Sequence, residues 1–133
     1  MAGTLVDSNV LLDLFTNDPR WSDWSETRLA DALDRGPTLI NPIVYAEISI
    51  GFERVEELEQ ALPAELEREA LTWEAAFLAG KCFIEYRRRG GQKRSPLPDF
   101  YIGAHAAVTG RALLTRDTRR YRKFFPRLEL ISP

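Results

Sequence analysis

Short apolar runs alternate with longer stretches of mixed polarity along this chain. Runs such as Leu5-Val6 and Thr38-Leu39-Ile40 are too short for helices and predict buried strands. The longer stretches repeat apolar side chains at helical spacing, and Asn41-Pro42 is typical of a helix start because an N-cap precedes proline. The expected strands are 5–6, 38–40, 112–115 and 128–131. The expected helices are 10–15, 24–33, 42–50, 54–62, 64–71, 72–89, 99–109 and 118–125.

This alternation of strands and helices predicts an α/β fold. Short apolar strands that alternate with helices are typical of a parallel sheet covered by helices on both faces. The chain has 133 residues and contains no internal repeat, low-complexity tract or linker. We therefore expect one domain over residues 1–133.

The composition indicates a globular protein and excludes several kinds of protein and metal site. Hydrophobic residues make up 44% and charged residues 29%, as is usual for soluble globular proteins. No apolar run approaches about 18 residues, and the N-terminus lacks the features of a signal peptide, so neither a membrane span nor export is expected. A single cysteine, Cys82, excludes an intramolecular disulfide and fits a reducing, cytoplasmic compartment. With one cysteine and one histidine the usual zinc sites are excluded, and a bound metal would need oxygen ligands.

The net charge of −2 conceals a strong asymmetry along the chain. Residues 87–127 contain twelve basic residues and only two acidic ones, whereas residues 53–74 are rich in glutamate. Both runs could be solvated helix faces. The basic run has a second interpretation, because a basic patch is the usual footprint of a partner that carries phosphate groups.

Three acidic residues lie where a strand or loop is expected to lead into a helix. Asp7 directly follows the strand 5–6, Asp117 lies between the strand 112–115 and the helix 118–125, and Asp99 falls in the first turn of its helix. Each alone is also explained as a turn residue or a helix cap, since an acid is favourable at a helix N-terminus. Glu47 is less usual, because it interrupts the apolar stripe of the helix 42–50, where an unpaired buried carboxylate is costly.

A parallel sheet brings such junctions to one edge. Carboxylates that converge there raise one another's pKa unless a cation neutralises them. Hard divalent ions such as Mg²⁺ bind oxygen ligands and can activate water for phosphodiester hydrolysis. An acidic cluster inside a basic surround therefore predicts a nuclease.

The order and spacing of four motifs resemble those of the PIN-domain ribonucleases, and in particular the VapC-type toxins of bacterial toxin–antitoxin pairs. The motifs are TLVDSN (4–9), AEI (46–48), PDFYIGAHA (98–106) and LLTRD (113–117). The resemblance covers essentially the whole chain. It implies a three-layer αβα sandwich around a mainly parallel sheet and an endoribonuclease that depends on Mg²⁺ or Mn²⁺. It also implies a homodimer and a cognate antitoxin protein that blocks the site.

The resemblance also assigns roles to individual residues. Asp7, Glu47, Asp99 and Asp117 form the catalytic acidic quartet, with Asp7 and Asp99 as the metal ligands. The supporting residues, which orient acids or water by hydrogen bonds, are Ser8, Asn9 and Thr115. The residues expected to contact RNA are Arg116, Arg119 and Arg120.

Three other functions are open to a chain with these residues. A phosphatase with Asp7 as nucleophile would usually have a second acid two residues later, where this chain has Asn9. A structure-selective deoxyribonuclease would use similar chemistry on DNA. A binding module without catalysis would use the acidic pocket to accept a basic segment of a partner.

Overall fold

The computed structural model describes residues 2–133, which form five strands and seven helices. The strands are β1 (Thr4–Val6), β2 (Thr38–Ile40), β3 (Glu67–Arg68), β4 (Ala112–Leu114) and β5 (Leu130–Ile131). The helices are α1 (Ser8–Phe15), α2 (Ser22–Arg35), α3 (Pro42–Ser49), α4 (Val55–Ala61), α5 (Trp73–Arg88), α6 (Pro98–Thr109) and α7 (Arg119–Phe124). No helix within residues 2–133 is long and apolar enough to span a membrane.

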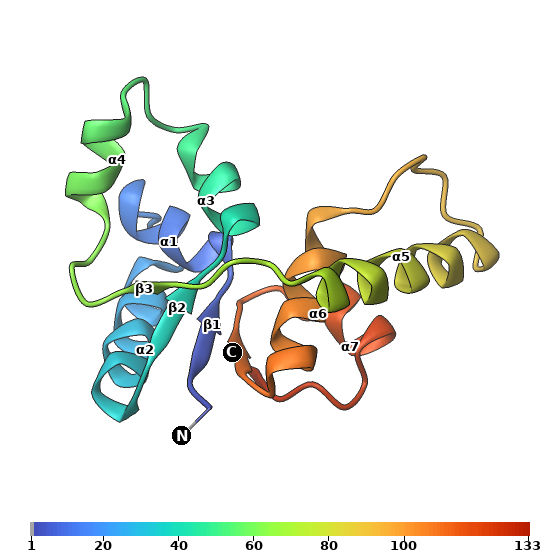
Figure 1. Ribbon diagram of the computed structural model, residues 1–133. Helices are drawn as coiled ribbons and strands as arrows, with labels where there is room; N and C mark the ends of the chain where they lie inside the picture. The colour runs from blue at the N-terminus through green and yellow to red at the C-terminus, as the bar shows by residue number, and fades with distance from the viewer. Residues whose placement is uncertain (1) are drawn as a thin grey trace.

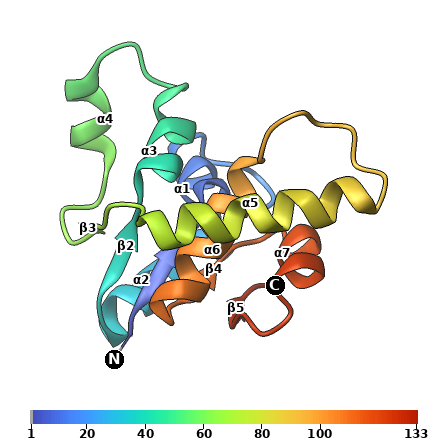
Figure 2. The same ribbon diagram turned by 45° about the vertical axis from the view of Figure 1, so that its right-hand side comes forward.

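The strands form one parallel sheet in the order β3-β2-β1-β4-β5. Figure 1 shows the sheet between two groups of helices, with α1 and α2 on one side and α5, α6 and α7 on the other. Figure 2 shows α5 lying across α6. The expected three-layer α/β sandwich with a mainly parallel sheet is therefore confirmed, and every strand pairing in the described residues is parallel.

The central strands are apolar because helices cover both of their faces. Leu5, Val6, Leu113 and Leu114 have no exposed surface, and Ile40 is almost equally buried. Burying a side chain of this size stabilises the fold by about 1.5–3 kcal/mol. These short apolar runs are the signal that predicted the strands from sequence.

The expected helix over 64–71 is wrong. Residues 67–68 instead form β3 at the edge of the sheet, paired with Leu39 and Ile40 of β2. The backbone N–H of Glu69 extends this pairing by donating to the carbonyl of Ile40 at 3.0 Å. Because β3 has only two residues and both side chains are exposed, it lacks the apolar run that marks the other strands.

Other boundaries differ by a few residues. The first helix begins at Ser8 rather than Val10, because Asp7 is its N-cap. The expected strand 128–131 is reduced to β5 over 130–131. The N-caps at Asn41 and Thr72 are confirmed, since each side-chain oxygen accepts a hydrogen bond from the backbone N–H three residues later.

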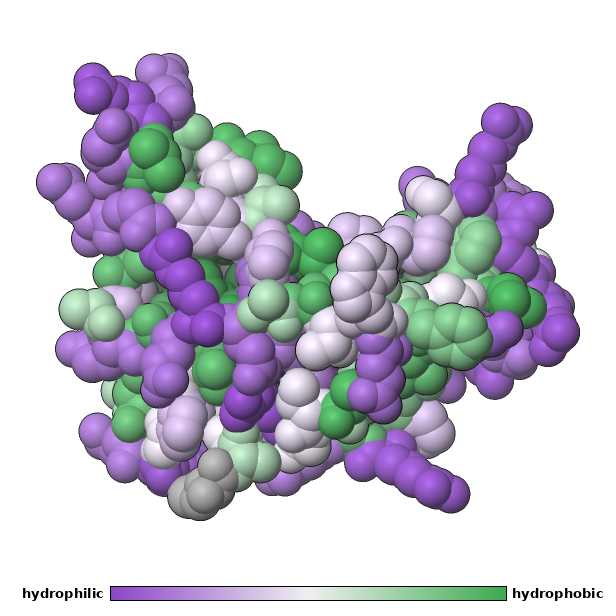
Figure 3. Space-filling view, viewed as in Figure 1, coloured by the Kyte–Doolittle hydropathy of each residue, from purple (hydrophilic) through white to green (hydrophobic). Residues whose placement is uncertain are grey.

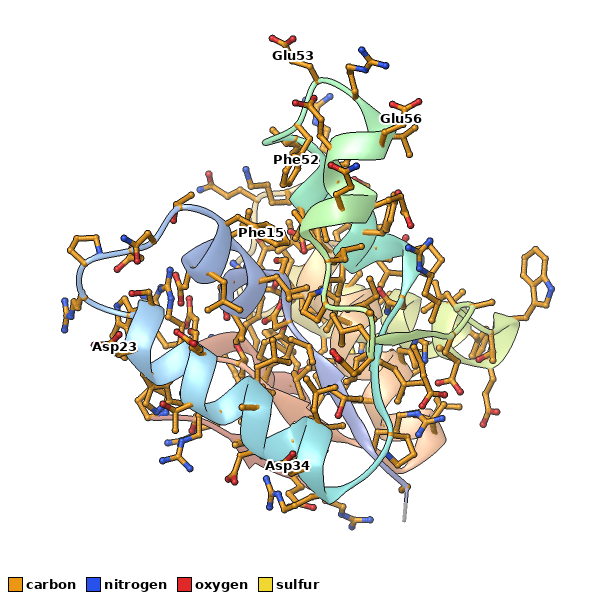
Figure 4. The ribbon with its side chains drawn as sticks, turned by 90° about the vertical axis from the view of Figure 1, so that its left-hand side faces the viewer. Phe15, Asp23, Asp34, Phe52, Glu53 and Glu56 are labelled. Atoms are coloured by element: carbon orange, nitrogen blue, oxygen red, sulfur yellow. The ribbon has the colours of Figure 1, made fainter. Side chains whose placement is uncertain are left out.

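The region after α3 is attached to the body of the protein by aromatic packing. The rings of Phe15, at the end of α1, and Phe52, after α3, meet edge to face with their centroids 5.3 Å apart. Figure 4 shows these two rings side by side. Leu58 of α4 is also buried and belongs to the hydrophobic core, so the projecting lobe that α3 and α4 form (Figure 1) is packed onto the body of the protein.

A polar network joins β3 to α6 and to the start of β4. Glu69 accepts hydrogen bonds from Arg111 at 2.6 and 3.0 Å and lies 2.7 Å from Nε2 of the buried His105. The other ring nitrogen of His105 faces the amide of Asn41, the N-cap of α3, at 3.1 Å. A neutral histidine with its proton on Nε2 satisfies both contacts. The network therefore connects the helices that carry Glu47 and Asp99.

Candidate active site

Three of the four predicted acids lie on segments that follow a strand, and the fourth begins a helix that follows a loop. Asp7 follows β1, and Asp117 follows β4, which is hydrogen-bonded to β1 in the sheet. Glu47 is on α3, which starts directly after β2, and Asp99 is in the first turn of α6. Figure 3 shows the surface hollowed between the lobe of α3 and α4 and the lobe at the far end of α5, and β1 ends beneath this hollow in Figure 1.

Asp7 is the most buried of the four acids, with 3% of its surface exposed. Its Oδ1 accepts a hydrogen bond from the backbone N–H of Ser8 at 2.8 Å. Its Oδ2 accepts hydrogen bonds from Thr115 Oγ1 at 2.9 Å and from Tyr121 Oη at 2.8 Å. Burial raises the pKa of Asp7, and the charge of Asp99 adds to this, although the hydrogen bonds oppose it.

Glu47 approaches Asp7 through a shared neighbour. The hydroxyl of Ser8 donates to Glu47 Oε1 at 2.9 Å, while it lies 3.5 Å from Asp7 Oδ1. Burial raises the pKa of Glu47, and the charges of Asp7 and Asp99 raise it further. The structure thus brings three of the predicted carboxylates, Asp7, Glu47 and Asp99, close enough to repel one another.

Asp99 and Asp117 are more exposed and each contacts an arginine of α7. Arg120 lies 3.2 Å from Asp99 Oδ2, and Arg119 lies 3.4 Å from Asp117 Oδ1. Partial burial opposes a low pKa at Asp117, but hydrogen bonds from Arg119 and the nearby positive charges lower it. Asp117 therefore differs from Asp7 and Glu47, whose negative charge has no cationic partner within residues 2–133.

The predicted supporting residues surround Asp7. Thr115 is fully buried, and its hydroxyl donates a hydrogen bond to Asp7. The same hydroxyl accepts hydrogen bonds from the side-chain amide of Asn9 at 3.1 Å and from the backbone N–H of Asp117 at 3.2 Å. Ser8 connects Asp7 to Glu47, as described above. Thr115 thereby links β4 and the Asp117 turn to the end of β1.

The chemistry of these donors fits a hard divalent cation, because they are carboxylate oxygens that repel one another without one. The side chains do not yet converge as ligands, since within residues 2–133 no three acidic, histidine or cysteine side chains are arranged to hold an ion. The hydroxyl of Tyr121 and the guanidinium of Arg120 contact Asp99 instead. Binding an ion would therefore involve rearrangement of side chains at Asp99.

The three arginines expected to contact RNA lie in different surroundings. Arg119 and Arg120 line a cavity of about 280 Å³ together with Asp99, Asp117 and Lys123. Arg116 instead donates from Nε to Asp13 at 2.8 Å, and Asp13 is a buried carboxylate that also accepts a hydrogen bond from Ser25. This internal ion pair joins residues 103 positions apart and was not predicted from the sequence.

Tyr121 is a residue of the site that was not predicted from the sequence. It lies on α7 with 1% of its surface exposed, and its hydroxyl is 2.8 Å from Asp7 Oδ2 and 3.4 Å from Asp99 Oδ1. Burial and the charges of Asp7 and Asp99 raise its pKa well above the ordinary value, so the hydroxyl remains a donor. No local pattern marked it, because the residues that its hydroxyl contacts lie 114 and 22 positions away in the sequence.

Comparisons with known proteins agree with this architecture. The family model described as the PIN domain matches residues 4–125. No curated protein matches the sequence.

Among solved structures, the chain is similar to VapBC2 from Rickettsia felis bound to a promoter DNA fragment, with a TM-score of 0.76, 20% identity and 98% coverage of each chain. It is also similar to DNA-bound VapBC from Salmonella typhimurium, with a TM-score of 0.74, 20% identity and coverage of 99% of this chain and 98% of that one. For VapBC-1 from nontypeable Haemophilus influenzae the TM-score is 0.72 at 18% identity, covering 97% of this chain and 96% of that one. At these identities the likeness is one of fold.

Proposed function

Because this chain belongs to the PIN domain family, we propose that it is a nuclease, and more specifically an endoribonuclease that depends on Mg²⁺ or Mn²⁺. The observation that carries the proposal is the meeting of Asp7, Glu47 and Asp99, which come from three separate elements, with the charge of Asp99 raising the pKa of both Asp7 and Glu47. Folding such a group together without a cation is costly. A bound divalent ion would neutralise the three carboxylates and would explain why the fold brings them together.

We assign the metal to Asp7 and Asp99, with Glu47 and Asp117 completing the catalytic site directly or through water. When bound, a divalent ion supplies Lewis-acid chemistry that lowers the pKa of water and stabilises charge on the phosphate. Ser8, Asn9 and Thr115 hold the carboxylates by hydrogen bonds.

The RNA backbone would be held by the basic side chains beside the acids. Arg119, Arg120 and Lys123 line the same cavity as Asp99 and Asp117, so a phosphate bound by them lies next to the acids. We also include Arg116 among the proposed RNA contacts, although its Nε already donates a hydrogen bond to Asp13.

We further propose that the protein is the toxin of a toxin–antitoxin pair and works in the cytoplasm as a homodimer. The support is its likeness in fold to chains of the VapBC complexes. Within this chain, Arg119 and Arg120 already place guanidinium groups against Asp117 and Asp99. A basic segment of an antitoxin would bind the same carboxylates and compete with metal and RNA.

The test is cleavage of structured RNAs by the full chain without a partner, with Mg²⁺ or Mn²⁺ and with EDTA. Asp7→Asn and Asp99→Asn are compared with Asp34→Asn, a matched change at an exposed acid on α2 (Figure 4). We expect metal-dependent cleavage that is lost in the first two variants, by about 100-fold or more, and kept in Asp34→Asn.

Other outcomes would change the proposal. Cleavage that survives both site substitutions would contradict the assignment of the site. Preferential competition by DNA would favour the deoxyribonuclease alternative. A wild-type protein that neither cleaves nor responds to metal, but binds a basic peptide through Asp7 and Asp99, would favour the binding module.

A further inference from the structure

The hydroxyl of Tyr121 lies between the two carboxylates assigned to the metal. It donates to Asp7 Oδ2 at 2.8 Å and is 3.4 Å from Asp99 Oδ1. A phenolic hydroxyl carries one proton, which it donates to the nearer carboxylate, Asp7, so that it lies beside Asp99 without a second proton to donate. A phenylalanine would fill the same buried space without a polar atom, so packing alone does not explain the hydroxyl.

Helix packing places this hydroxyl. On α6, Gly103 lies four residues after Asp99, and on the α7 side Phe125 lies four residues after Tyr121. A Cβ atom on Gly103 would come within 2.4 Å of the Phe125 ring, so the absence of a side chain lets the two segments touch at this point. One helical turn away, the same packing brings Tyr121 against Asp99. The position of the hydroxyl is thus set by two elements and not by a mobile side chain.

The hydrogen bonds of Asp7 leave room for a further ligand. The Tyr121 and Thr115 hydroxyls occupy Oδ2, whereas Oδ1 accepts strongly only from the Ser8 backbone N–H, at 2.8 Å. The Ser8 hydroxyl is directed to Glu47, at 2.9 Å, in preference to Asp7, at 3.5 Å. Since each carboxylate oxygen has two lone pairs, Oδ1 keeps one for a cation.

We propose that Tyr121 is a positioning residue of the candidate active site, whose hydroxyl holds the Asp7 carboxylate in the orientation in which it binds the divalent ion. The proposal rests on the metal-dependent function argued above and goes beyond it by adding a residue outside the acidic quartet. Groups that orient metal ligands in this way contribute to affinity although they do not touch the ion.

The test is the affinity of the metal-free full chain for Mn²⁺, measured by isothermal titration calorimetry without RNA. We expect Tyr121→Phe to bind Mn²⁺ about 10- to 100-fold more weakly than wild type. The matched control is Tyr101→Phe on α6, because the Tyr101 hydroxyl contacts neither carboxylate in the described residues, and its Mn²⁺ affinity should be unchanged. Excess Mn²⁺ should restore RNA cleavage by Tyr121→Phe, a rescue that general loss of structure would not allow.

The outcomes separate the two proposals. Equal or tighter Mn²⁺ binding by folded Tyr121→Phe would overturn the role of Tyr121 and leave the nuclease proposal standing. A wild-type chain that binds no Mn²⁺ would overturn the metal-dependent function, and the role of Tyr121 with it.

A second measurement covers the case in which Tyr121→Phe does not fold by circular dichroism. The chain is labelled with 3-fluorotyrosine, and the Tyr121 resonance is assigned by exclusion with phenylalanine variants of Tyr45, Tyr86 and Tyr101. We expect Mg²⁺ to shift the Tyr121 fluorine signal in a saturable manner and to leave the Tyr101 signal in place. An unchanged Tyr121 signal at Mg²⁺ concentrations that raise the melting temperature would contradict the proposal.

Discussion

At the scale of single residues, two buried aspartates have opposite electrostatic surroundings. Asp13 has 2% of its surface exposed and is neutralised by Arg116, with a further hydrogen bond from Ser25. Asp7 is equally buried, but within residues 2–133 its partners are hydroxyl, amide and backbone donors and no cation. The contrast indicates that Asp13 has a structural role, whereas Asp7 keeps its charge available for a ligand.

The ion pair of Asp13 makes Arg116 more important for stability than its neighbours. We expect Arg116→Met to lower the free energy of unfolding by about 3 kcal/mol, because the substitution leaves a buried carboxylate without its cation. Arg119→Met, which removes an exposed pair with Asp117, should change it by less than about 1 kcal/mol. Urea denaturation of both variants at neutral pH provides the comparison. Equal losses would contradict a structural role that is specific to Arg116.

At the scale of elements, the pairing of α6 with α7 controls the geometry of the site. The contact between Gly103 and Phe125 sets how closely the two segments approach, and Tyr121 and Asp99 lie one turn away. A change at this contact should therefore act on the site at a distance. The neighbouring aromatic rings of Phe100 and Phe124, 5.2 Å apart and edge to face, extend the same interface.

We expect Gly103→Ala to lower the free energy of unfolding by about 1–3 kcal/mol through overpacking against the Phe125 ring. The loss should be smaller in a Phe125→Leu background, and a double-mutant cycle measured by urea denaturation gives the coupling. Gly80→Ala on α5 is the matched control, because nothing lies within 4 Å of the added Cβ. That variant should gain stability, by up to about 1 kcal/mol. A coupling of zero in the cycle would show that Phe125 is not what limits the space at Gly103.

At the scale of the whole molecule, Glu69 connects parts that are distant in sequence. Its carboxylate contacts Arg111 at the start of β4 and His105 on α6, while its backbone extends β3 along β2. Hydrogen bonds from Arg111 and His105 lower the pKa of Glu69 from 4.5 to about 2. The bonds from Arg111 have the largest effect, and they outweigh partial burial, which would raise this pKa. The ion pair between Glu69 and Arg111 thus joins the glutamate-rich residues 53–74 to the basic residues 87–127.

This low pKa gives the stability a defined pH dependence. Because the folded pKa lies below the unfolded one, the contribution of Glu69 is fully present above pH 4.5 and is lost as the pH falls toward 2. We expect Glu69→Gln to lower the free energy of unfolding at pH 7 by on the order of 2–3 kcal/mol and to flatten its decline in acid. Glu65→Gln, at an exposed position with no ion pair in the described residues, should leave both unchanged. Parallel stability curves for wild type and Glu69→Gln between pH 5 and 2 would refute the linkage.

The sequence by itself determined the α/β class, three of the five strands nearly to the residue and the positions of the four acids along the chain. It did so because these features are local: an apolar run of three residues marks a strand covered on both faces, and a capping residue marks the helix that follows. The edge strand β3 was not predictable, because its two exposed charged residues are held in a strand by their pairing with Leu39 and Ile40.

Only the tertiary structure decided which side chains accompany the acids. Tyr121 reaches Asp7 across 114 positions of sequence, and Arg116 reaches Asp13 across 103. Neither contact leaves a local pattern, since each depends on the order of strands in the sheet and on how closely α6 and α7 pack. Sequence patterns report the conformation of neighbouring residues, whereas the hydrogen bonds and ion pairs around this site follow from the meeting of distant elements.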